Sequence, residues 1–280
     1  MMRKLMAVFA HPDDEGVMSG TMAHYIEQGD EVMLVCTTRG EAGEISDPVL
    51  ATPENLGEVR QKELEEAARI IGVQQLVFLD YRDSGMAGTP ANDDPRCLLQ
   101  AEPDRVIGDL VALIREFQPD VFVTFEPFGW YGHPDHVTTG QHATAAFYQA
   151  ADPVRFPEHG AAFQASSLYQ SVFLFTRFRE IALAAKAAGY IEGEGFFSEE
   201  PRPEQVAIEQ EITHQLDVRP YVDLKNQALA AHRTQFGEDD EFGKIPPEMM
   251  LEFNGYEQFV QVYPEPDGAL RANWASSLFL

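Results

Sequence analysis

The sequence predicts an α/β protein with a Rossmann-like, mostly parallel sheet flanked by helices. Short apolar runs alternate with segments whose apolar residues recur at helical spacing, which is typical of βαβ units. A length of 280 residues and a hydrophobic content of 44% suit one well-packed globular core. Two of the apolar runs are followed by the tripeptide His-Pro-Asp. In parallel sheets the carboxyl ends of strands share one edge, where ligands bind.

The first half of the chain supplies the expected sheet. Its strand candidates are, in order, Leu5–Ala10, Glu31–Thr38, Leu76–Leu79 and Val121–Phe125, with Tyr169–Thr176 following. The helix candidates between them are Gly16–Gln28, Pro53–Ile71, Arg105–Phe117 and Val137–Ala150. The most strongly amphipathic is Pro53–Ile71, and Gly72 ends it. This alternation implies right-handed crossovers between parallel strands.

The later part of the chain is less regular. We expect helices at Phe178–Ala188 and Val222–His232, loops at Ile191–Pro203 and Glu238–Pro247, and a short helix–strand element at Phe253–Tyr263. No composition shift marks a linker. We therefore predict a single domain over residues 1–280, with a core of about 4–176 and a C-terminal extension of about 177–280.

Charge and cysteine content exclude several classes of partner. The net charge of −26 argues against nucleic acid and anionic membrane surfaces. Cys36 and Cys97 form no metal motif, which suits a reducing cytoplasm. No apolar run is long enough to span a bilayer, and the basic start lacks the uninterrupted apolar run of a signal peptide. We expect a cytoplasmic protein that acts on a small molecule, and a homo-oligomer is compatible with the sequence.

The first strand ends in MAVFAHPDDE, which places an imidazole and three carboxylates at one turn. Such a group is costly to hold together without a cation. The second motif, GHPDH, follows the apolar run Val121–Phe125. A lone His-Pro-Asp is more often a turn, but two at strand ends favour a metal site. His11, Asp14 and His136 would supply two histidines and one carboxylate with a position left for water, the arrangement of catalytic zinc.

The remaining polar residues of the two motifs have both structural and chemical interpretations. Asp13 is a candidate general base that faces the attacking water, or the N-cap of the following helix. His133 and His136 are both candidate metal ligands, or only one of them binds. Asp135 is a candidate partner for the imidazole that does not bind metal. Tyr131 is a candidate oxyanion donor or a packed loop aromatic.

Five stretches of the chain resemble the LmbE/PIG-L family of zinc-dependent N-deacetylases, and most closely the mycothiol-pathway branch of GlcNAc-inositol deacetylases and S-conjugate amidases. They are AHPDDE, TRGEAG (38–43), YRDSGMAGTPAN (81–92), YGHPDH (131–136) and KNQALAAHRTQF (225–236). The loop EPFGWYGHPDH departs from the familiar pattern at Phe128 and Trp130. The resemblance runs from about residue 4 to residue 236.

The resemblance implies a zinc site and a general base. His11, Asp14 and His136 match the zinc ligands of the family, and Asp13 matches its base. Iron(II) is the alternative to zinc as the bound metal.

The resemblance also implies the other roles. His133 matches a histidine that stabilises the tetrahedral intermediate and helps the amine depart, and Asp135 matches its orienting partner. Tyr131 matches a mobile tyrosine that stabilises the oxyanion. Arg39 and Asp83 match contacts to sugar or inositol hydroxyls, for which Arg is a suitable donor and Asp a suitable acceptor.

The expected function is metal-dependent removal of an acetyl group from an amino-sugar conjugate such as GlcNAc-inositol or GlcNAc-malate. An amidase acting on thiol S-conjugates of the mycothiol type is the alternative within the enzyme class. A non-catalytic metal- or sugar-binding module is the alternative from another class. A nucleotide-binding module is disfavoured, because no G-x-G-x-x-G follows the first strand and the carboxylates of HPDDE occupy the position of a phosphate.

Overall fold

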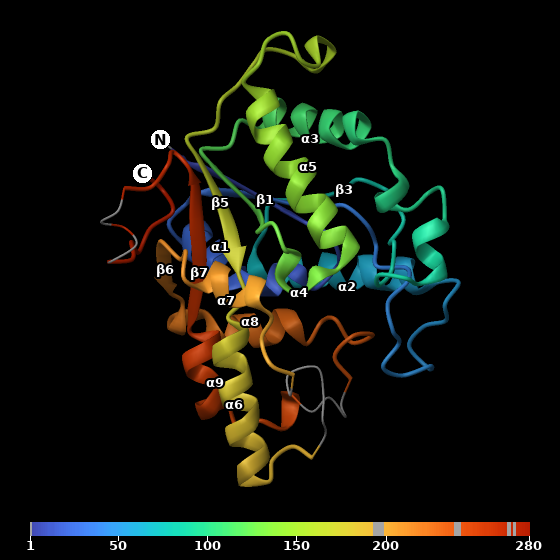
Figure 1. Ribbon diagram of the computed structural model, residues 1–280, viewed down its shortest axis with the longest axis vertical. Coiled ribbons are helices and arrows are strands. Elements are labelled where there is room, and N and C mark those ends of the chain that lie inside the picture. The colour runs from blue at the N-terminus through green and yellow to red at the C-terminus, as the bar shows by residue number, and fades with distance from the viewer. Residues whose placement is uncertain (1, 193–198, 238–241, 268–269, 271–272) are drawn as a thin grey trace.

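The computed structural model describes residues 2–192, 199–237, 242–267, 270 and 273–280. Its strands are β1 (Lys4–Phe9), β2 (Glu31–Cys36), β3 (Gln75–Phe78), β4 (Val121–Phe125), β5 (Ser167–Val172), β6 (His214–Asp217) and β7 (Tyr256–Tyr263). They form one sheet in the order β3-β2-β1-β4-β5-β7-β6 (Figure 1). Strands β1 to β5 pair in parallel, and β7 is antiparallel to both β5 and β6. The predicted α/β fold with a mostly parallel sheet is confirmed.

Helices cover both faces of this sheet. They are α1 (Ser19–Glu27), α2 (Leu56–Ile71), α3 (Pro103–Phe117), α4 (Gly129–Gly132), α5 (Pro134–Ala150), α6 (Phe175–Ala188), α7 (Pro203–Glu209), α8 (Val222–Leu229) and α9 (Pro247–Asn254). One core packs Met22 of α1 and Leu64 of α2 against the sheet, and the other packs Leu110 of α3 and Phe147 of α5 (Figure 1). Because helices cover both faces of the sheet, β1 and β4 are buried on both sides and consist mainly of apolar residues.

The structure changes several predicted boundaries. The helix expected from Gly16 is a 3-10 turn at Asp14–Val17 followed by α1. The helix expected from Val137 begins at Pro134, because proline suits the first helical position. The strand predicted at Tyr169–Thr176 ends at Val172, and α6 begins at Phe175.

Helices α4 and α7, most of α9, and strand β6 were not predicted, and two predicted loops are only partly described. Helix α7 is short, and β6 reads HQLD, which lacks the apolar alternation of a typical strand. The predicted loops at 191–203 and 238–247 lie partly outside the described residues.

The order of the strands fixes the position of the site. Strand β1 lies between β2 and β4. The chain adds β2 and β3 on one side of β1, and then crosses over to add β4 and β5 on the other side. The carboxyl ends of β1 and β4 therefore meet at a topological switch point, where α/β proteins bind ligands.

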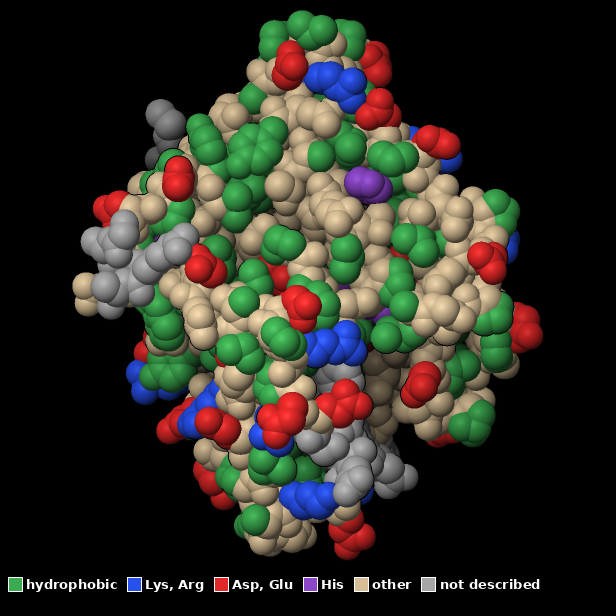
Figure 2. Space-filling model, viewed as in Figure 1, with side chains coloured by type: hydrophobic (Ala, Val, Ile, Leu, Met, Phe, Trp, Pro, Cys, Tyr) green, Lys and Arg blue, Asp and Glu red, His purple; other side chains and the backbone are tan. Residues whose placement is uncertain are grey.

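The chain is strongly acidic, with a net charge of −26. Figure 2 shows acidic side chains spread over the visible face rather than gathered in one patch. Among the described helices, none combines the length and the apolar character that crossing a bilayer requires.

Candidate metal centre and active site

The turn after β1 is shaped by the side chain of Asp14. Its Oδ2 accepts the backbone N–H groups of Ala10 and His11, at 3.1 and 2.7 Å. Asp13 adopts a left-handed conformation with φ 118°, which is unusual for a residue with a side chain. The result is that the two neighbouring carboxylates point in different directions, and only that of Asp14 folds back onto the end of the strand.

The loop after β4 is held by a buried carboxylate. Glu126 is 2% exposed and accepts the N–H groups of Phe128 and Trp130, at 2.6 and 2.5 Å. Trp130 has φ 59° and ψ −63°, so this loop is locally strained. His133 is the N-cap of α5, and its Nδ1 accepts the N–H of Asp135 at 3.2 Å. His136 consequently lies in the first turn of the helix.

The two motifs meet at the end of the sheet. His11 Nδ1 lies 3.1 Å from His136 Nε2 and 3.6 Å from Asp14 Oδ2. His136 Nε2 lies 3.2 Å from Asp14 Oδ1. All three residues are at least 94% buried, since their exposed fractions are 6%, 1% and 6% for His11, His136 and Asp14. The structure thus brings together the three side chains that were predicted to bind metal.

The spacing of these donor atoms fits a divalent cation. A tetrahedral zinc ion with bonds of about 2.0–2.1 Å holds its ligand atoms about 3.3 Å apart. The two nitrogens, His11 Nδ1 and His136 Nε2, are 3.1 Å apart, and they lie 3.6 and 3.2 Å from the Oδ2 and Oδ1 atoms of Asp14, respectively, so each separation is near this value. His133 is also close enough to His11 and His136 to join a ligand set, and Asp83 and Asp135 form a second possible set with His11. The geometry alone therefore leaves more than one combination of ligands open.

The carboxylate of Asp135 makes its described histidine contact with His11, whereas the contact of Asp135 with the His133 ring is through its backbone N–H. His11 Nε2 lies 3.2 Å from Asp135 Oδ2 and 3.6 Å from Asp83 Oδ1. Asp135 Oδ2 also accepts the N–H of Ser84 at 2.9 Å. The reason is the helix geometry, because the N-cap position of His133 brings the backbone of Asp135, not its side chain, to the His133 ring. A carboxylate on Nε2 leaves Nδ1 of His11 to bind a metal.

The titration behaviour of these groups reflects a surplus of buried carboxylates. Burial would lower the pKa of His11, but Asp83, Asp135 and Asp14 outweigh it and raise that pKa well above its usual value. Burial would raise the pKa of Asp14, but His136 and His11 lower it to about 2. A protonated His11 supplies positive charge to this cluster, and a divalent cation would supply it more fully.

Asp13 lies at the edge of this cluster and pairs with an arginine. Arg60 Nη2 lies 3.0 Å from Asp13 Oδ2 and donates to the carbonyl of Pro12 at 2.6 Å. Burial raises the pKa of Asp13 to about 6, and Arg60 opposes the rise. Asp13 is the N-cap residue of the 3-10 turn, but its side chain makes no cap hydrogen bond. Asp13 is 20% exposed at its side chain and is the accessible carboxylate of the turn.

A second buried pair holds the backbone of this turn. His232 Nε2 lies 2.6 Å from Glu15 Oε1, and both side chains are almost fully buried. The other oxygen of Glu15 accepts the N–H of Asp13 at 3.0 Å. The C-terminal region therefore reaches the first motif through His232.

His133 is neutral in this environment. Burial lowers its pKa to about 3, and the nearby rings of His11 and His136 add to the effect. Its Nδ1 accepts a backbone N–H, so that nitrogen carries no proton. The carboxylate of Asp135 lies beside His11 rather than beside His133.

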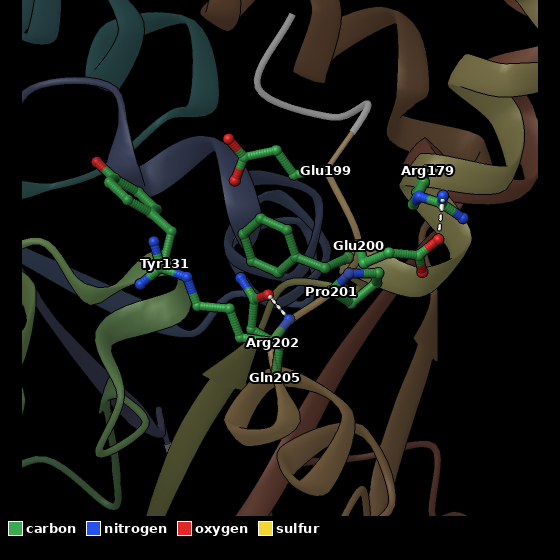
Figure 3. A pocket seen from close by; sticks show the side chains of 8 residues that line it. Tyr131, Arg179, Glu199, Glu200, Pro201, Arg202 and Gln205 are labelled. Atoms are coloured by element: carbon green, nitrogen blue, oxygen red, sulfur yellow. Dashed lines mark hydrogen bonds and ion pairs between the residues drawn. The ribbon is translucent and has the colours of Figure 1, made fainter.

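Tyr131 lies beside the histidines of the cluster and also lines a small pocket with residues 199–202 and 205. The ring centroid of Tyr131 lies 4.9 Å from that of His136 and 6.1 Å from that of His133. Burial raises the pKa of its hydroxyl far above the usual range. Figure 3 shows the guanidinium of Arg202 next to Tyr131 in a pocket whose far side holds the Arg179–Glu200 ion pair.

The two predicted substrate contacts have different surroundings. Asp83 is 2% exposed, and its two oxygens accept the N–H groups of Gly85 and Ala42 at 2.7 and 3.1 Å. It lies beside His11, at the centre of the cluster. Arg39 forms an ion pair with the exposed Asp80 and donates from Nε to Gln61 at 2.6 Å. The structure therefore joins Asp83 to the metal cluster and pairs Arg39 with residues outside it.

Sequence reasoning missed Arg60, Glu126 and His232. Each of these residues has a feature in the sequence that could have indicated its role. Arg60 occupies the buried stripe of α2, between Leu56 and Leu64 at helical spacing, where an unpaired arginine is costly. Glu126 follows a fully buried strand directly. His232 is the histidine of the segment at 225–236 that carries the family resemblance.

The chain is similar to proteins of a known family. Residues 6–147 match the family described as "PIG-L: GlcNAc-PI de-N-acetylase". A protein named 1D-myo-inositol 2-acetamido-2-deoxy-alpha-D-glucopyranoside deacetylase 1, from Catenulispora acidiphila, is 36% identical over 280 residues, 95% of this chain and 86% of the relative. A deacetylase of the same name from Thermobifida fusca is 37% identical over 278 residues, 94% of each chain.

Solved structures share the fold. An N,N'-diacetylchitobiose deacetylase from Pyrococcus horikoshii superposes with a TM-score of 0.66 at 23% identity, covering 96% of this chain and 88% of the other. A 4-carboxy-2-hydroxymuconate hydratase from Pseudomonas putida has a TM-score of 0.63 at 20% identity, covering 95% and 98%. The same architecture thus supports more than one chemistry. The match over half of the chain, and relatives above 35% identity over nearly all of it, establish that this protein belongs to the PIG-L family of N-deacetylases.

Proposed function

We propose that this protein is a metal-dependent deacetylase that removes the acetyl group from a GlcNAc conjugate, of which GlcNAc-inositol is the first candidate. The observation that carries the proposal is the juxtaposition of His11, Asp14 and His136 with an accessible carboxylate, Asp13. The names of the relatives from Catenulispora acidiphila and Thermobifida fusca support the choice of substrate.

We assign the metal to His11, Asp14 and His136, with zinc as the first candidate and iron(II) as the second. Two imidazoles and one carboxylate are ligands that both ions accept. A bound divalent cation would activate a water molecule and polarise the acyl carbonyl. Asp135 and Asp83 orient His11 by holding its Nε2, which fixes Nδ1 as the binding atom.

We assign Asp13 as the general base. A carboxyl group whose pKa is near 6 is largely ionised at neutral pH and still accepts a proton readily. Arg60 keeps this carboxylate charged and fixes its orientation through two contacts to the turn. The proton that Asp13 takes from the attacking water is the one that the leaving amine needs.

We assign His133 and Tyr131 to the opposite side of the reacting carbonyl. His133 is neutral at rest, with its Nδ1 occupied by a backbone N–H, so Nε2–H is free to donate to the oxyanion or the departing amine. Tyr131 retains its proton at all ordinary pH values and is a second donor. Asp83 and Arg39 remain the proposed contacts to the sugar portion.

The proposal is tested by acetate release. The purified protein is stripped with a chelator, loaded with one equivalent of zinc or iron(II), and incubated with GlcNAc-inositol, GlcNAc-malate and N-acetylglucosamine. We expect zinc- or iron-dependent release of acetate and free amine from at least one conjugate, and loss of this activity in Asp13→Asn. A metal-loaded protein that binds the conjugates without releasing acetate would instead be a sugar-binding module.

A further inference from the structure

A large cavity lies next to the proposed active site and belongs to no role assigned above. Its volume is about 530 Å³, within the range of small-molecule pockets, and Asp13 forms part of its wall. The wall continues through Gly16 and Val17 of the 3-10 turn, so the cavity begins directly beside the first motif.

The rest of the wall is mainly apolar and comes from the C-terminal half of the chain. The end of β5 contributes Val172, α6 contributes Phe178, α8 contributes Leu229, and α9 contributes Met250 and Phe253. In Figure 1 the helices α6, α8 and α9 lie together below the sheet. This apolar part of the wall is suited to a hydrocarbon group, because burying such a group against apolar side chains is favourable.

The cationic residue of the wall is already neutralised. Lys225 pairs with Glu257, which is 1% exposed at its side chain and also accepts the N–H groups of Gly20 and Thr21 at 3.0 and 2.7 Å. In the described part of its wall, the cavity therefore offers no free positive charge to an anionic ligand. This favours a neutral, apolar occupant.

The position of Asp13 indicates which part of a substrate enters the cavity. In the described part of its wall the cavity includes Asp13 but not Tyr131, His133 or His136. In the proposed function Asp13 faces the attacking water, and the amine is assigned to the side of His133. Of the groups on the acyl carbon, the sugar-bearing amine is polar and the acyl chain is apolar, so the apolar wall beside Asp13 fits the acyl chain.

We propose that this cavity is an acyl-chain pocket, and that the enzyme hydrolyses N-acyl conjugates with aliphatic chains longer than acetyl. The inference rests on the proposed function, because it assumes hydrolysis of an N-acylated amino sugar. The reaction stays balanced for any chain: water adds its hydroxyl to the acyl carbon, the C–N bond breaks, and the products are a carboxylate and a free amine. The extra methylenes leave water for the apolar wall of Leu229, Met250 and Phe253.

The test uses glucosaminyl-inositol carrying acetyl, butanoyl or hexanoyl groups, with kcat/KM measured for each on the zinc-loaded protein. Each buried methylene favours binding by up to about three- to fourfold. We expect kcat/KM to stay level or rise from acetyl to hexanoyl. A fall of more than tenfold from acetyl to hexanoyl would overturn the pocket, while hydrolysis of none of the three would overturn the proposed function instead.

A pair of variants locates the effect. Ala230→Trp places an indole at an exposed alanine of the cavity wall, and Ala187→Trp makes the same change at an exposed alanine of α6 outside the described wall. We expect Ala230→Trp to reduce the hexanoyl-to-acetyl ratio of kcat/KM at least tenfold, and Ala187→Trp to leave that ratio unchanged. An equal loss for all chain lengths in Ala230→Trp would show that the chain binds elsewhere.

A binding measurement does not depend on turnover. Titration calorimetry of the metal-free protein with octanamide, and with acetamide as the control, reports on the cavity alone. We expect octanamide to bind at least tenfold more tightly than acetamide, and Ala230→Trp to abolish the difference. Equal binding of the two amides by the wild-type protein would contradict the proposal.

Discussion

The guanidinium of Arg60 lies 3.0 Å from the carboxylate of Asp13, joining helix α2 to the turn after β1. Arg60 is 3% exposed, whereas the side chain of Asp13 is 20% exposed. The same guanidinium donates to the carbonyls of Pro12 and Gly40, at 2.6 and 3.1 Å, so it is fixed in place. The proposed base is therefore positioned and kept ionised by a residue that contacts no proposed metal ligand.

We expect Arg60→Ala to move the acid limb of the pH–rate profile upward. Arg60 opposes the rise in the pKa of Asp13 that burial causes, so its removal raises that pKa above about 6. A base with a higher pKa is ionised only at higher pH, and the loss of kcat is therefore larger at pH 6 than at pH 8. Arg69→Ala, on the exposed face of the same helix, is the control. Identical acid limbs in wild type and Arg60→Ala would assign the limb to another group.

We expect His11→Ala and His136→Ala to lose stoichiometric metal. Each removes one of the three donor atoms, and the remaining two rarely hold zinc at micromolar concentrations. Metal content after dialysis, measured by plasma mass spectrometry, is the readout, and His142→Ala on the same helix α5 is the control. Full occupancy in either ligand variant would exclude that residue from the site.

We expect Asp135→Asn to weaken metal affinity by about 10- to 100-fold, the usual effect of losing a carboxylate that orients a histidine ligand. Its carboxylate lies 3.2 Å from His11 Nε2. Competition with a chromophoric chelator measures the affinity directly. Unchanged affinity together with a shifted pH–rate profile would restore the role of Asp135 as the partner of His133.

We expect His133→Ala to lower kcat by about 10²- to 10⁴-fold with metal content unchanged. The resting ring is neutral, since burial holds its pKa near 3, and it becomes a cation only by taking a proton within the reaction. The alkaline limb of the profile is therefore not set by titration of free His133, and it should stay in place in His133→Gln where residual activity is measurable. Loss of metal from His133→Ala would identify it as a ligand.

We expect Glu126→Ala to destabilise the fold by about 1–3 kcal/mol, because buried N–H groups lose their acceptor. The carboxylate accepts from Phe128 and Trp130 and thereby holds the strained loop that carries Tyr131. Urea unfolding of the metal-free protein measures the change, with the exposed Glu116→Ala as the control. A change equal to that of Glu116→Ala would show that the loop holds its shape without this carboxylate.

The sequence by itself determined the parallel sheet and the place of both motifs. Strands buried on both faces need continuous apolar runs, and Leu5–Ala10 and Val121–Phe125 are such runs. The first His-Pro-Asp motif follows Leu5–Ala10 directly, and the second follows Val121–Phe125 after the loop at 126–132. The adjacency of β1 and β4 then brings His11 and His136 together.

The tertiary structure alone decided which polar group faces which. The partner of Asp13 is on α2, and the partner of Glu15 is His232, whose positions relative to the turn depend on how helices pack across the sheet. The orientation of Asp135 toward His11 follows from the N-cap geometry of His133, which no residue spacing specifies. Local patterns encode elements because they depend on neighbours in sequence, whereas hydrogen bonds between elements depend on the packing of the whole chain.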